Sequence, residues 1–440
     1  MRSWVIHSSD RIRGAIRVPG DKSISHRSLL LGALAHGTTE VRGLLRSEDC
    51  LATLAALRAL GVEITEWADG RVEIQGKDAE GLREPGEILD AGNSGTTLRL
   101  LAGVLAGRPF FSVLTGDASL RRRPMRRVVD PLSAMGATLL GRADGQYPPL
   151  AIQGRRLSGI AWTSPVASAQ VKSAILLAGL QATGETSVTE PLPSRDHTER
   201  MLEAFGIAVR RQGRTVGVAG PARLQAARFA VPGDLSSAAF FLVAAAACPR
   251  SEVLIRDVGV NPTRTGVLEI LEAMGASISE TPTRAEAGEP TAELMVRGAS
   301  LHGTRIGAEA VPRLIDEIPV LAVAAALAEG ETVVSGAAEL RVKEVDRISA
   351  VAEELAKLGV QVAEERDGLR IAGGRRLHGT IVRSRGDHRM AMALAVAGLF
   401  AEGETRVEDV ACVETSFPGF ARLLVEVAPD CGIREVDEHN

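Results

Sequence analysis

The chain has 440 residues, of which 45% are hydrophobic and 24% are charged, and its formal net charge is −4 at pH 7. This length and composition are typical of a globular protein with two domains and exclude a disordered chain. The near-neutral charge provides no overall field that would attract nucleic acid or an anionic membrane.

Cysteine usage and the lack of long apolar segments indicate a cytoplasmic protein. The four cysteines are scattered, which is typical of reduced thiols in a cytosolic chain. Residues 1–11 contain no apolar segment of signal-peptide length, and apolar runs such as 238–248 are shorter than the ~20 residues that span a bilayer. We therefore expect a cytoplasmic protein that binds neither nucleic acid nor a membrane.

Two sequence patterns recur along the chain. An apolar helix followed by a Thr/Val-rich strand is predicted at 29–41, 175–188, 320–334 and 393–407. The end of an amphipathic helix, a glycine and then alternating apolar residues recur, with the glycine at positions 61, 136, 206, 275, 359 and, more weakly, 432. A glycine in that place is typical of a left-handed helix terminus. Each unit is predicted to run helix, strand, loop, helix, strand, strand, with the first helix buried and the second outside.

Six such units predict two α/β domains of three units each. Val18-Pro19-Gly20-Asp21 recurs as Val231-Pro232-Gly233-Asp234, each time just before a buried helix. We predict an N-terminal domain at 21–230 and a C-terminal domain at 1–20 plus 231–440, with a hinge near 18–21 and 231–234. The Pro/Gly/Glu-rich residues 281–292 widen one repeat and are interpreted as a loop insertion.

The residues that open the six buried helices suggest an anion site. These helices are predicted to open at Lys22, Asn93, Ser168, Asp234, Asp316 and Asp387. Three parallel buried helices would gather their N-termini, where N–H groups and helix dipoles attract anions. Basic residues stand at these ends or in nearby loops, at Lys22, Arg27, Arg123, Arg195, Lys343, Arg347 and Arg389. Simple capping is the alternative for any one position, but together they predict a cleft between domains for anionic substrates.

Single motifs of the sequence also allow other interpretations. The run Arg121–Arg127 could bind nucleic acid, but the aromatics and the basic domain that such binding needs are missing. Asp316 could be a plain helix cap, and Glu344 could belong to a salt-bridged turn. The sequence has no P-loop, Rossmann fingerprint, H-E-x-x-H or G-x-S-x-G motif, which argues against nucleotide, dinucleotide, zinc and serine-hydrolase chemistry.

Four motifs resemble signatures of the 5-enolpyruvylshikimate-3-phosphate (EPSP) synthases, the 3-phosphoshikimate 1-carboxyvinyltransferases. They read PGDKSISHR at 19–27, GNSGTTLR at 92–99, RVKEVDR at 341–347 and DHRMAM at 387–392. The resemblance covers nearly the whole chain. It implies an inside-out α/β barrel of the enolpyruvyl transferase type, with six βαβαββ-type units, three per domain. Two domains would close on shikimate 3-phosphate.

The resemblance implies transfer of the enolpyruvyl group of phosphoenolpyruvate to the 5-hydroxyl of shikimate 3-phosphate. Phosphate would leave by addition–elimination, in the shikimate pathway of aromatic amino acid biosynthesis. Shikimate 3-phosphate would be bound by Lys22, Ser23, Arg27, Ser168, Ala169, Gln170, Ser194, Arg195, Asp316 and Lys343. Phosphoenolpyruvate would be bound by Lys22, Asn93, Gly95, Arg123, Gln170, Arg347 and Arg389.

The chemistry explains the catalytic residues that the resemblance implies. Two acid–base groups must act on either side of the reacting carbon. Asp316 would take the hydroxyl proton, Glu344 would exchange the methyl proton, and Lys22 would offset negative charge. The resemblance implies no metal and no cofactor, and we expect a monomer.

Several positions resemble a divergent (class II-like) branch of the family. Asp21 and His26 replace a common Ser and Asn, His197 lies near a common Tyr, and Thr415 stands where a phosphate-side Lys is common. Gly95 is retained where members resistant to the inhibitor glyphosate often carry Ala. Sensitivity to that inhibitor stays open.

Two alternative functions are compatible with parts of the sequence. A transferase acting on UDP-N-acetylglucosamine would share the fold and phosphoenolpyruvate, but we would expect a Cys near Arg123 and an Asn after the first Lys, where this chain has Ser23. A non-catalytic anion-binding relative would keep the site without turnover. It is disfavoured because Lys22, Asp316 and Glu344 are all present.

Overall fold

The computed structural model describes residues 2–437, which fold into two compact units. Unit 1 comprises Met1–Pro19, Gly233–Arg284 and Pro290–Asn440, and unit 2 comprises Gly20–Pro232 and Ala285–Glu289. The chain passes from one unit to the other near the predicted boundaries, and a hinge at those places stays a prediction. None of the helices in residues 2–437 is both long and apolar enough to cross a membrane.

Unit 2 contains three four-stranded sheets. Their orders are β14-β3-β5-β4, β6-β7-β9-β8 and β10-β11-β13-β12. The strands are β3 (Thr38–Arg42), β4 (Glu63–Glu66), β5 (Val72–Gln75), β6 (Leu89–Asp90), β7 (Phe111–Thr115), β8 (Thr138–Gly141), β9 (Tyr147–Gln153), β10 (Ala161–Thr163), β11 (Gly184–Thr189), β12 (Arg210–Gln212), β13 (Thr215–Gly220) and β14 (Arg228–Ala230). The helices are α1 (Lys22–Leu34), α2 (Glu48–Ala59), α3 (Gly95–Ala106), α4 (Arg126–Ala134), α5 (Arg142–Gly145), α6 (Ala169–Gly179) and α7 (His197–Ala204).

Unit 1 repeats this plan. Its four-stranded sheets have the orders β16-β17-β15-β2, β18-β19-β21-β20 and β23-β25-β1-β26, and β22 pairs with β24. The strands are β1 (Arg2–His7), β2 (Arg13–Ile16), β15 (Glu252–Gly259), β16 (Ser277–Glu286), β17 (Glu289–Arg297), β18 (Arg305–Ile306), β19 (Glu331–Val334), β20 (Gln361–Glu365), β21 (Gly368–Ala372), β22 (Leu377–His378), β23 (Ile381–Arg383), β24 (Ala401–Glu402), β25 (Glu404–Glu408) and β26 (Arg434–Asp437). The helices are α8 (Leu235–Ala247), α9 (Gly266–Ala273), α10 (Val311–Leu314), α11 (Ile318–Leu327), α12 (Arg347–Lys357), α13 (His388–Gly398) and α14 (Phe420–Val427).

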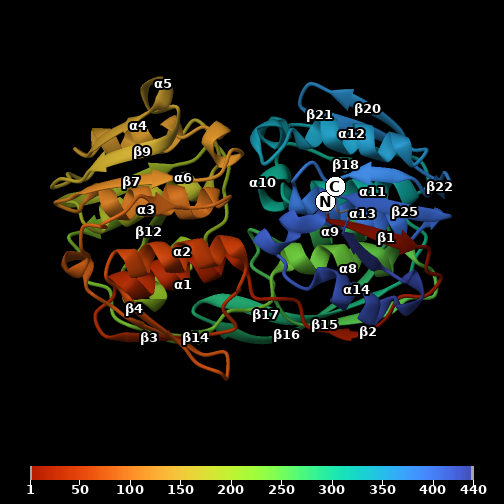
Figure 1. Cartoon of the computed structure of the whole chain (residues 1–440), viewed down its shortest axis with the longest axis horizontal. Helices are drawn as coiled ribbons and strands as arrows, with labels where there is room; N and C mark the ends of the chain where they lie inside the picture. The colour runs from red at the N-terminus through yellow and green to blue at the C-terminus, as the bar shows by residue number, and fades with distance from the viewer. Residues whose placement is uncertain (1, 438–440) are drawn as a thin grey trace. The chain divides into compact units, whose positions relative to one another are not determined.

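The N-terminal segment completes the sheets of unit 1. Strand β1 takes the middle position between β25 and β26 and is antiparallel to both, while β2 is the parallel partner of β15. In Figure 1, β1 is red and lies beside the blue strand β25. The sixth repeat therefore takes one of its strands from the start of the chain.

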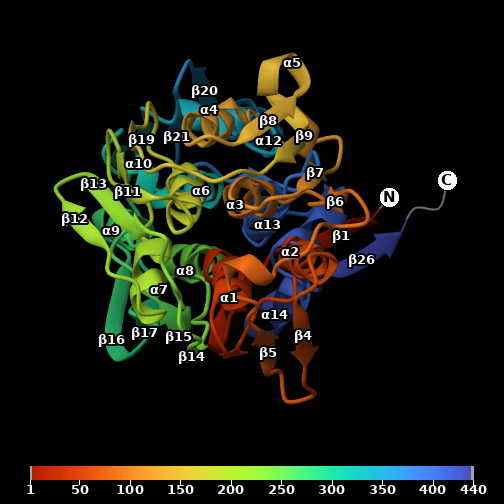
Figure 2. The same ribbon diagram turned by 90° about the vertical axis from the view of Figure 1, so that its left-hand side faces the viewer.

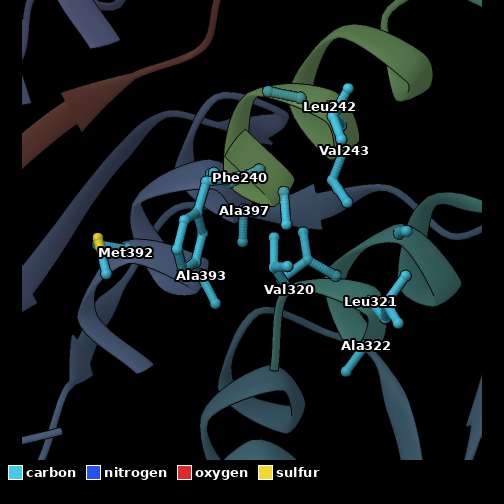
Figure 3. Close-up of a cluster of buried hydrophobic side chains, with 14 of the residues drawn as sticks. Phe240, Leu242, Val243, Val320, Leu321, Ala322, Met392, Ala393 and Ala397 are labelled. Atoms are coloured by element: carbon cyan, nitrogen blue, oxygen red, sulfur yellow. The ribbon is translucent and has the colours of Figure 1, made fainter. Parts of the chain in front are cut away.

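The first helix of each repeat lies inside its unit. In unit 1, α8, α11 and α13 pack through side chains such as Phe240, Val320 and Ala393 (Figure 3). In unit 2, α1, α3 and α6 lie inside, with the strands of the three sheets around them (Figure 2). These helices are apolar on nearly every face, so burial on all sides removes the most apolar surface from water. This is the predicted inside-out α/β architecture.

One sequence interpretation was wrong. Residues 281–292 are not a loop insertion, because β16 and β17 extend through them as two strands joined by a short turn. The Pro, Gly and Glu residues of this segment resemble a loop in composition, but β16 is exposed along nearly its whole length, so polar residues are tolerated in the strand. The tip of this hairpin, 285–289, belongs to unit 2, which the sequence did not predict.

A hydrogen-bonded layer joins the buried ends of three helices in unit 2. The ring Nδ1 of His26 on α1 lies 2.7 Å from Thr53 Oγ1 on α2, which lies 2.7 Å from Thr97 Oγ1 on α3. Burial, together with the charges of Lys22 and Arg27, lowers the pKa of His26 well below its ordinary value. The imidazole is therefore neutral in the folded protein.

The closest helix packing in unit 2 depends on Gly103. A Cβ at this position would lie 2.3 Å from the carbonyl oxygen of Ala174, so α3 and α6 meet backbone to backbone. We predict that Gly103→Ala lowers the free energy of unfolding by about 1–3 kcal/mol, because overpacking forces the helices apart. The denaturant midpoint measures this change. Gly86→Ala is the control, because no atom lies within 4 Å of its added Cβ.

Stability should fall as the pH drops below about 6.5, where unfolded histidine gains a proton. His26 stays neutral in the fold because its pKa is lowered, so the unfolded chain binds more protons in this window and acid favours unfolding. His26→Asn should therefore flatten the stability profile between pH 6.5 and the lower pKa of the folded protein. Denaturant melts across this range test this, with exposed His302→Asn as control. An unchanged slope in the His26 variant would refute the assignment.

Candidate functional site

The N-termini of the three buried helices in unit 2 are capped by side chains. Asp21 accepts a hydrogen bond from Ile24 N at 2.9 Å, and Ser94 accepts one from Thr97 N at 3.0 Å. Ser168 accepts from Val171 N at 3.4 Å. The capping interpretation is thus correct for these residues. The neighbouring residues Lys22, Gly95 and Ala169, which begin the helices, are the predicted ligand contacts.

Lys22 is held by an acidic residue of the next helix. Its Nζ lies 3.0 Å from Asp49 Oδ2 on α2, and both side chains keep some exposure. The backbone oxygen of Asp49 accepts from Thr97 Oγ1 at 3.3 Å, which connects this pair to α3. Lys22 is therefore fixed in direction but still able to meet an anion.

The second predicted cluster forms at the start of α3. Arg123 donates to Asn93 Oδ1 at 2.9 Å, and Asn93 donates to Asp117 Oδ2 at 2.7 Å. A Cβ at Gly95 would lie 3.2 Å from Arg123 Nη1 and 2.8 Å from Arg99 Nη1. Any larger residue at position 95 would have to displace these guanidinium groups. Gly95 therefore provides the space in which two arginines approach the helix N-terminus.

Arg99 lies within the motif at 92–99, and the sequence alone predicts no role for it. Its Nη1 donates to Gln170 Oε1, and Gln170 Nε2 donates to Thr96 Oγ1 at 2.8 Å. These bonds join the starts of α3 and α6. The available signal was the helical spacing, since Arg99 follows Gly95 by one turn and lies on the same face.

Arg27 is buried, and each of its three side-chain nitrogens makes a hydrogen bond. Its Nε donates to Thr198 Oγ1 at 2.6 Å, one Nη donates to Ser173 Oγ at 2.7 Å, and the other donates to Ser23 O at 2.9 Å. Burial lowers the pKa of Arg27 to about 10, so the side chain stays charged at neutral pH. The three hydrogen bonds of Arg27 hold Ser23 and α7 in place.

The third predicted segment lies between β11 and α7. Ser194 is buried and Arg195 is half-buried. His197, which stands near the position of a common Tyr, contacts Glu289 through Nδ1 at 2.7 Å, and both side chains are buried. Glu289 comes from the hairpin tip, so this partner was not foreseeable from local sequence.

In unit 1, the predicted acids meet around Arg347. This guanidinium is 1% exposed. Its Nη1 lies 3.3 Å from Asp316 Oδ1 and its Nη2 lies 2.8 Å from Glu344 Oε2. Lys343 Nζ approaches Asp316 Oδ1 at 3.1 Å. The structure thus brings together the four predicted residues Asp316, Lys343, Glu344 and Arg347.

Asp387 completes this cluster and was predicted only as a helix opener. It accepts from Arg347 Nε at 2.8 Å and caps α13 through Arg389 N at 2.8 Å. Burial by itself lowers the pKa of Arg347, but the charges of Asp387, Glu344 and Asp316 outweigh burial and raise the pKa. Arg347 is therefore a permanent cation that keeps both predicted acids close together.

Arg389 lies at the edge of the same cluster. Its Nη2 is 3.9 Å from Asp316 Oδ2, and its Nη1 is 3.8 Å from Glu317 Oε1. Thr415, in the place of a common Lys, donates to Cys412 O at 2.7 Å within its own turn. Taken alone, each unit presents basic side chains beside helix N-termini, and unit 1 adds two carboxylates suited to proton transfer.

Comparison with known proteins places the chain in one family. The family model described as EPSP synthase (3-phosphoshikimate 1-carboxyvinyltransferase) matches residues 6–424. A 3-phosphoshikimate 1-carboxyvinyltransferase from Desulforamulus reducens is 55% identical over 423 residues, covering 96% of this chain and 99% of the relative. A protein of the same name from Desulfitobacterium hafniense is 57% identical, with 96% and 97% covered.

Solved structures agree with this result. The EPSP synthase from Acinetobacter baumannii superposes with a TM-score of 0.88 at 45% identity, covering 99% of this chain and 100% of that chain. The enolpyruvyl transferase NikO from Streptomyces tendae has a TM-score of 0.81 at 20% identity, which supports the fold alone. The predicted fold class and the resemblance read from the motifs are confirmed. The chain belongs to the EPSP synthase (3-phosphoshikimate 1-carboxyvinyltransferase) family.

Proposed function

We propose that this chain transfers the enolpyruvyl group of phosphoenolpyruvate to the 5-hydroxyl of shikimate 3-phosphate and releases phosphate. The observation that carries the proposal is the position of Asp316 and Glu344 on one buried guanidinium, that of Arg347. The reaction removes one proton from an attacking hydroxyl and handles a second proton at a methylene carbon. Two neighbouring carboxylates in a basic setting suit both tasks.

The residues of unit 2 are assigned mainly to anion binding. Helix N-termini and the fork of an arginine both favour phosphate and carboxylate oxygens. We assign shikimate 3-phosphate to Lys22, Ser23, Arg27, Ser168, Ala169, Gln170, Ser194 and Arg195. We assign phosphoenolpyruvate to Lys22, Asn93, Gly95, Arg123 and Gln170. Support comes from the bonds that fix Lys22, Arg123 and Gln170 beside the starts of α1, α3 and α6.

The residues of unit 1 are assigned to proton transfer and charge stabilisation. Asp316 takes the proton of the attacking hydroxyl, and Lys343, which lies 3.1 Å away, helps to orient it. Glu344 adds and removes the proton at the methylene carbon. Arg347 and Arg389 offset the charge of the carboxylate and of the departing phosphate. Lys22 contributes the same kind of stabilisation from unit 2.

We also propose that the chain acts as a cytoplasmic monomer. Cys50, Cys248, Cys412 and Cys431 are all free thiols. Burial raises the pKa of Cys412 to about 12 and that of Cys50 still higher, so these thiols are poorly reactive. Inert, unpaired cysteines suit a reducing compartment.

Phosphate release tests the substrate assignment. Purified protein mixed with phosphoenolpyruvate and shikimate 3-phosphate, without added metal, should release phosphate. Omitting shikimate 3-phosphate, or replacing it with UDP-N-acetylglucosamine, should abolish release. Turnover only with the UDP-sugar would move the assignment to the other enolpyruvyl transferase. Binding of shikimate 3-phosphate without turnover in any mixture would favour a non-catalytic relative.

Glu344→Gln tests the proton assignment. The amide keeps the shape of the side chain but cannot exchange a proton, so kcat should fall about 10²–10⁴-fold. Solvent deuterium should then fail to enter the methylene group of recovered phosphoenolpyruvate, as measured by mass spectrometry. Glu353→Gln is the control, because this acid lies on the exposed side of α12 and pairs with Arg385. Undiminished deuterium entry in the Glu344 variant would exclude Glu344 from this role.

A further inference from the structure

A buried group of three charged side chains in unit 2 has no role in the proposed chemistry. Lys172 on α6 is 3% exposed, and its Nζ lies 2.7 Å from Glu199 Oε1 and 2.9 Å from Glu190 Oε2. The two acids are 1% and 4% exposed. Burial by itself lowers the pKa of Lys172, but Glu199 and Glu190 outweigh burial and raise the pKa, so the lysine is charged at neutral pH.

A gain in folding stability alone does not explain a buried group of three charged side chains. Removing charges from water costs several kcal/mol per ion, and well-packed apolar residues of similar volume are often as stabilising as a buried ion pair. Most of the buried side chains around it in unit 2 are apolar, so apolar residues could be accommodated there. A benefit that apolar packing cannot supply, namely a fixed geometry for neighbouring polar groups, is a better explanation.

The triad reaches three segments that carry assigned ligand contacts. The second carboxylate oxygen of Glu190 accepts from the backbone N of Ser168 at 3.1 Å. Lys172 Nζ donates to the carbonyl oxygen of Ser194 at 3.5 Å. These contacts attach the loop between β11 and α7 to the start of α6. They set the distance between Ser168 and Ser194, and Arg195 follows directly in the chain.

Besides its contacts near Ser168 and Ser194, the triad is connected through Glu199 to α7, the helix that contacts Arg27. Glu199 is adjacent in sequence to Thr198, whose Oγ1 accepts from Arg27 Nε at 2.6 Å and lies 2.6 Å from Ser173 Oγ. Ser173 also accepts from Arg27 Nη2 at 2.7 Å. The ion pair of Lys172 with Glu199 therefore fixes the helix that holds Arg27. All three segments are tied to one ammonium group.

We propose that Lys172 is a positioning residue for shikimate 3-phosphate, holding Ser168, the Ser194–Arg195 loop and Arg27 in one arrangement around the ligand. This inference rests on the proposed function, which assigns those three segments to that ligand. Lys172 itself does not touch the substrate, because its donors are committed to Glu190, Glu199 and Ser194 O. Loss of Lys172 should therefore weaken the binding of shikimate 3-phosphate much more than that of phosphoenolpyruvate, whose assigned contacts share only Gln170 with these segments.

The test is Lys172→Met, which keeps most of the length of the unbranched side chain and removes its charge. The dissociation constant of shikimate 3-phosphate, measured by calorimetry with the protein alone, and its KM should rise about ten- to a hundredfold, as expected for misplaced ligand contacts. The KM of phosphoenolpyruvate should rise far less, because of its assigned contacts only Gln170 lies on these segments. Lys172→Arg, which keeps the charge, should recover part of the affinity.

Lys357→Met is the matched control, because Lys357 also pairs with a buried glutamate, Glu354, but belongs to unit 1. It should leave both KM values unchanged. If Lys172→Met does not fold, Glu190→Gln decides the matter, because it keeps the shape and removes the charge that binds Lys172. A folded variant of either kind with both KM values unchanged, or raised equally, would overturn the inference. Failure of the parent protein to bind shikimate 3-phosphate would instead refute the proposed function.

Discussion

The whole architecture depends on burying helices that are apolar on every side. Three such helices in each unit can approach closely only where their side chains are small, as where Gly103 on α3 meets the backbone of Ala174 on α6. Once helices are buried along their length, their polar ends are the places where unpaired N–H groups must find partners. Side-chain caps such as Asp21, Ser94 and Asp387 meet part of this need. The remaining donors create a surface that favours anions.

Charge balance is the second organising feature. The cations that would bind an anionic substrate are each paired with nearby acids, as Lys22 is with Asp49 and Arg347 with Asp316, Glu344 and Asp387. In unit 1 this arrangement also keeps two carboxylates beside one guanidinium without the repulsion that neighbouring acids would otherwise suffer. The same pairs thus fix the directions of these charged side chains in the folded protein.

Buried polar networks extend this organisation away from the helix ends. In unit 2, the His26–Thr53–Thr97 layer and the triad of Lys172, Glu190 and Glu199 each connect elements that are distant in sequence. Such networks are costly when incomplete and rigid when satisfied. A loop such as the one that carries Ser194 is not rigid by itself, and contacts to such a network hold it in place. The scaffold therefore supplies geometry through polar contacts as well as through packing.

The sequence by itself determined the repeated units, the burial of the first helix in each unit and the capping residues, because helix periodicity and cap chemistry are local properties. The quoted motifs also identified the family. Only the tertiary structure decided which residues partner one another. Asp387 contacts Arg347 in the buried cluster of unit 1. Glu289 contacts His197 from a hairpin whose composition resembles that of a loop. Strand β1 closed the sixth sheet from the opposite end of the chain. These contacts join residues far apart in sequence, and no local pattern encodes the distance between them.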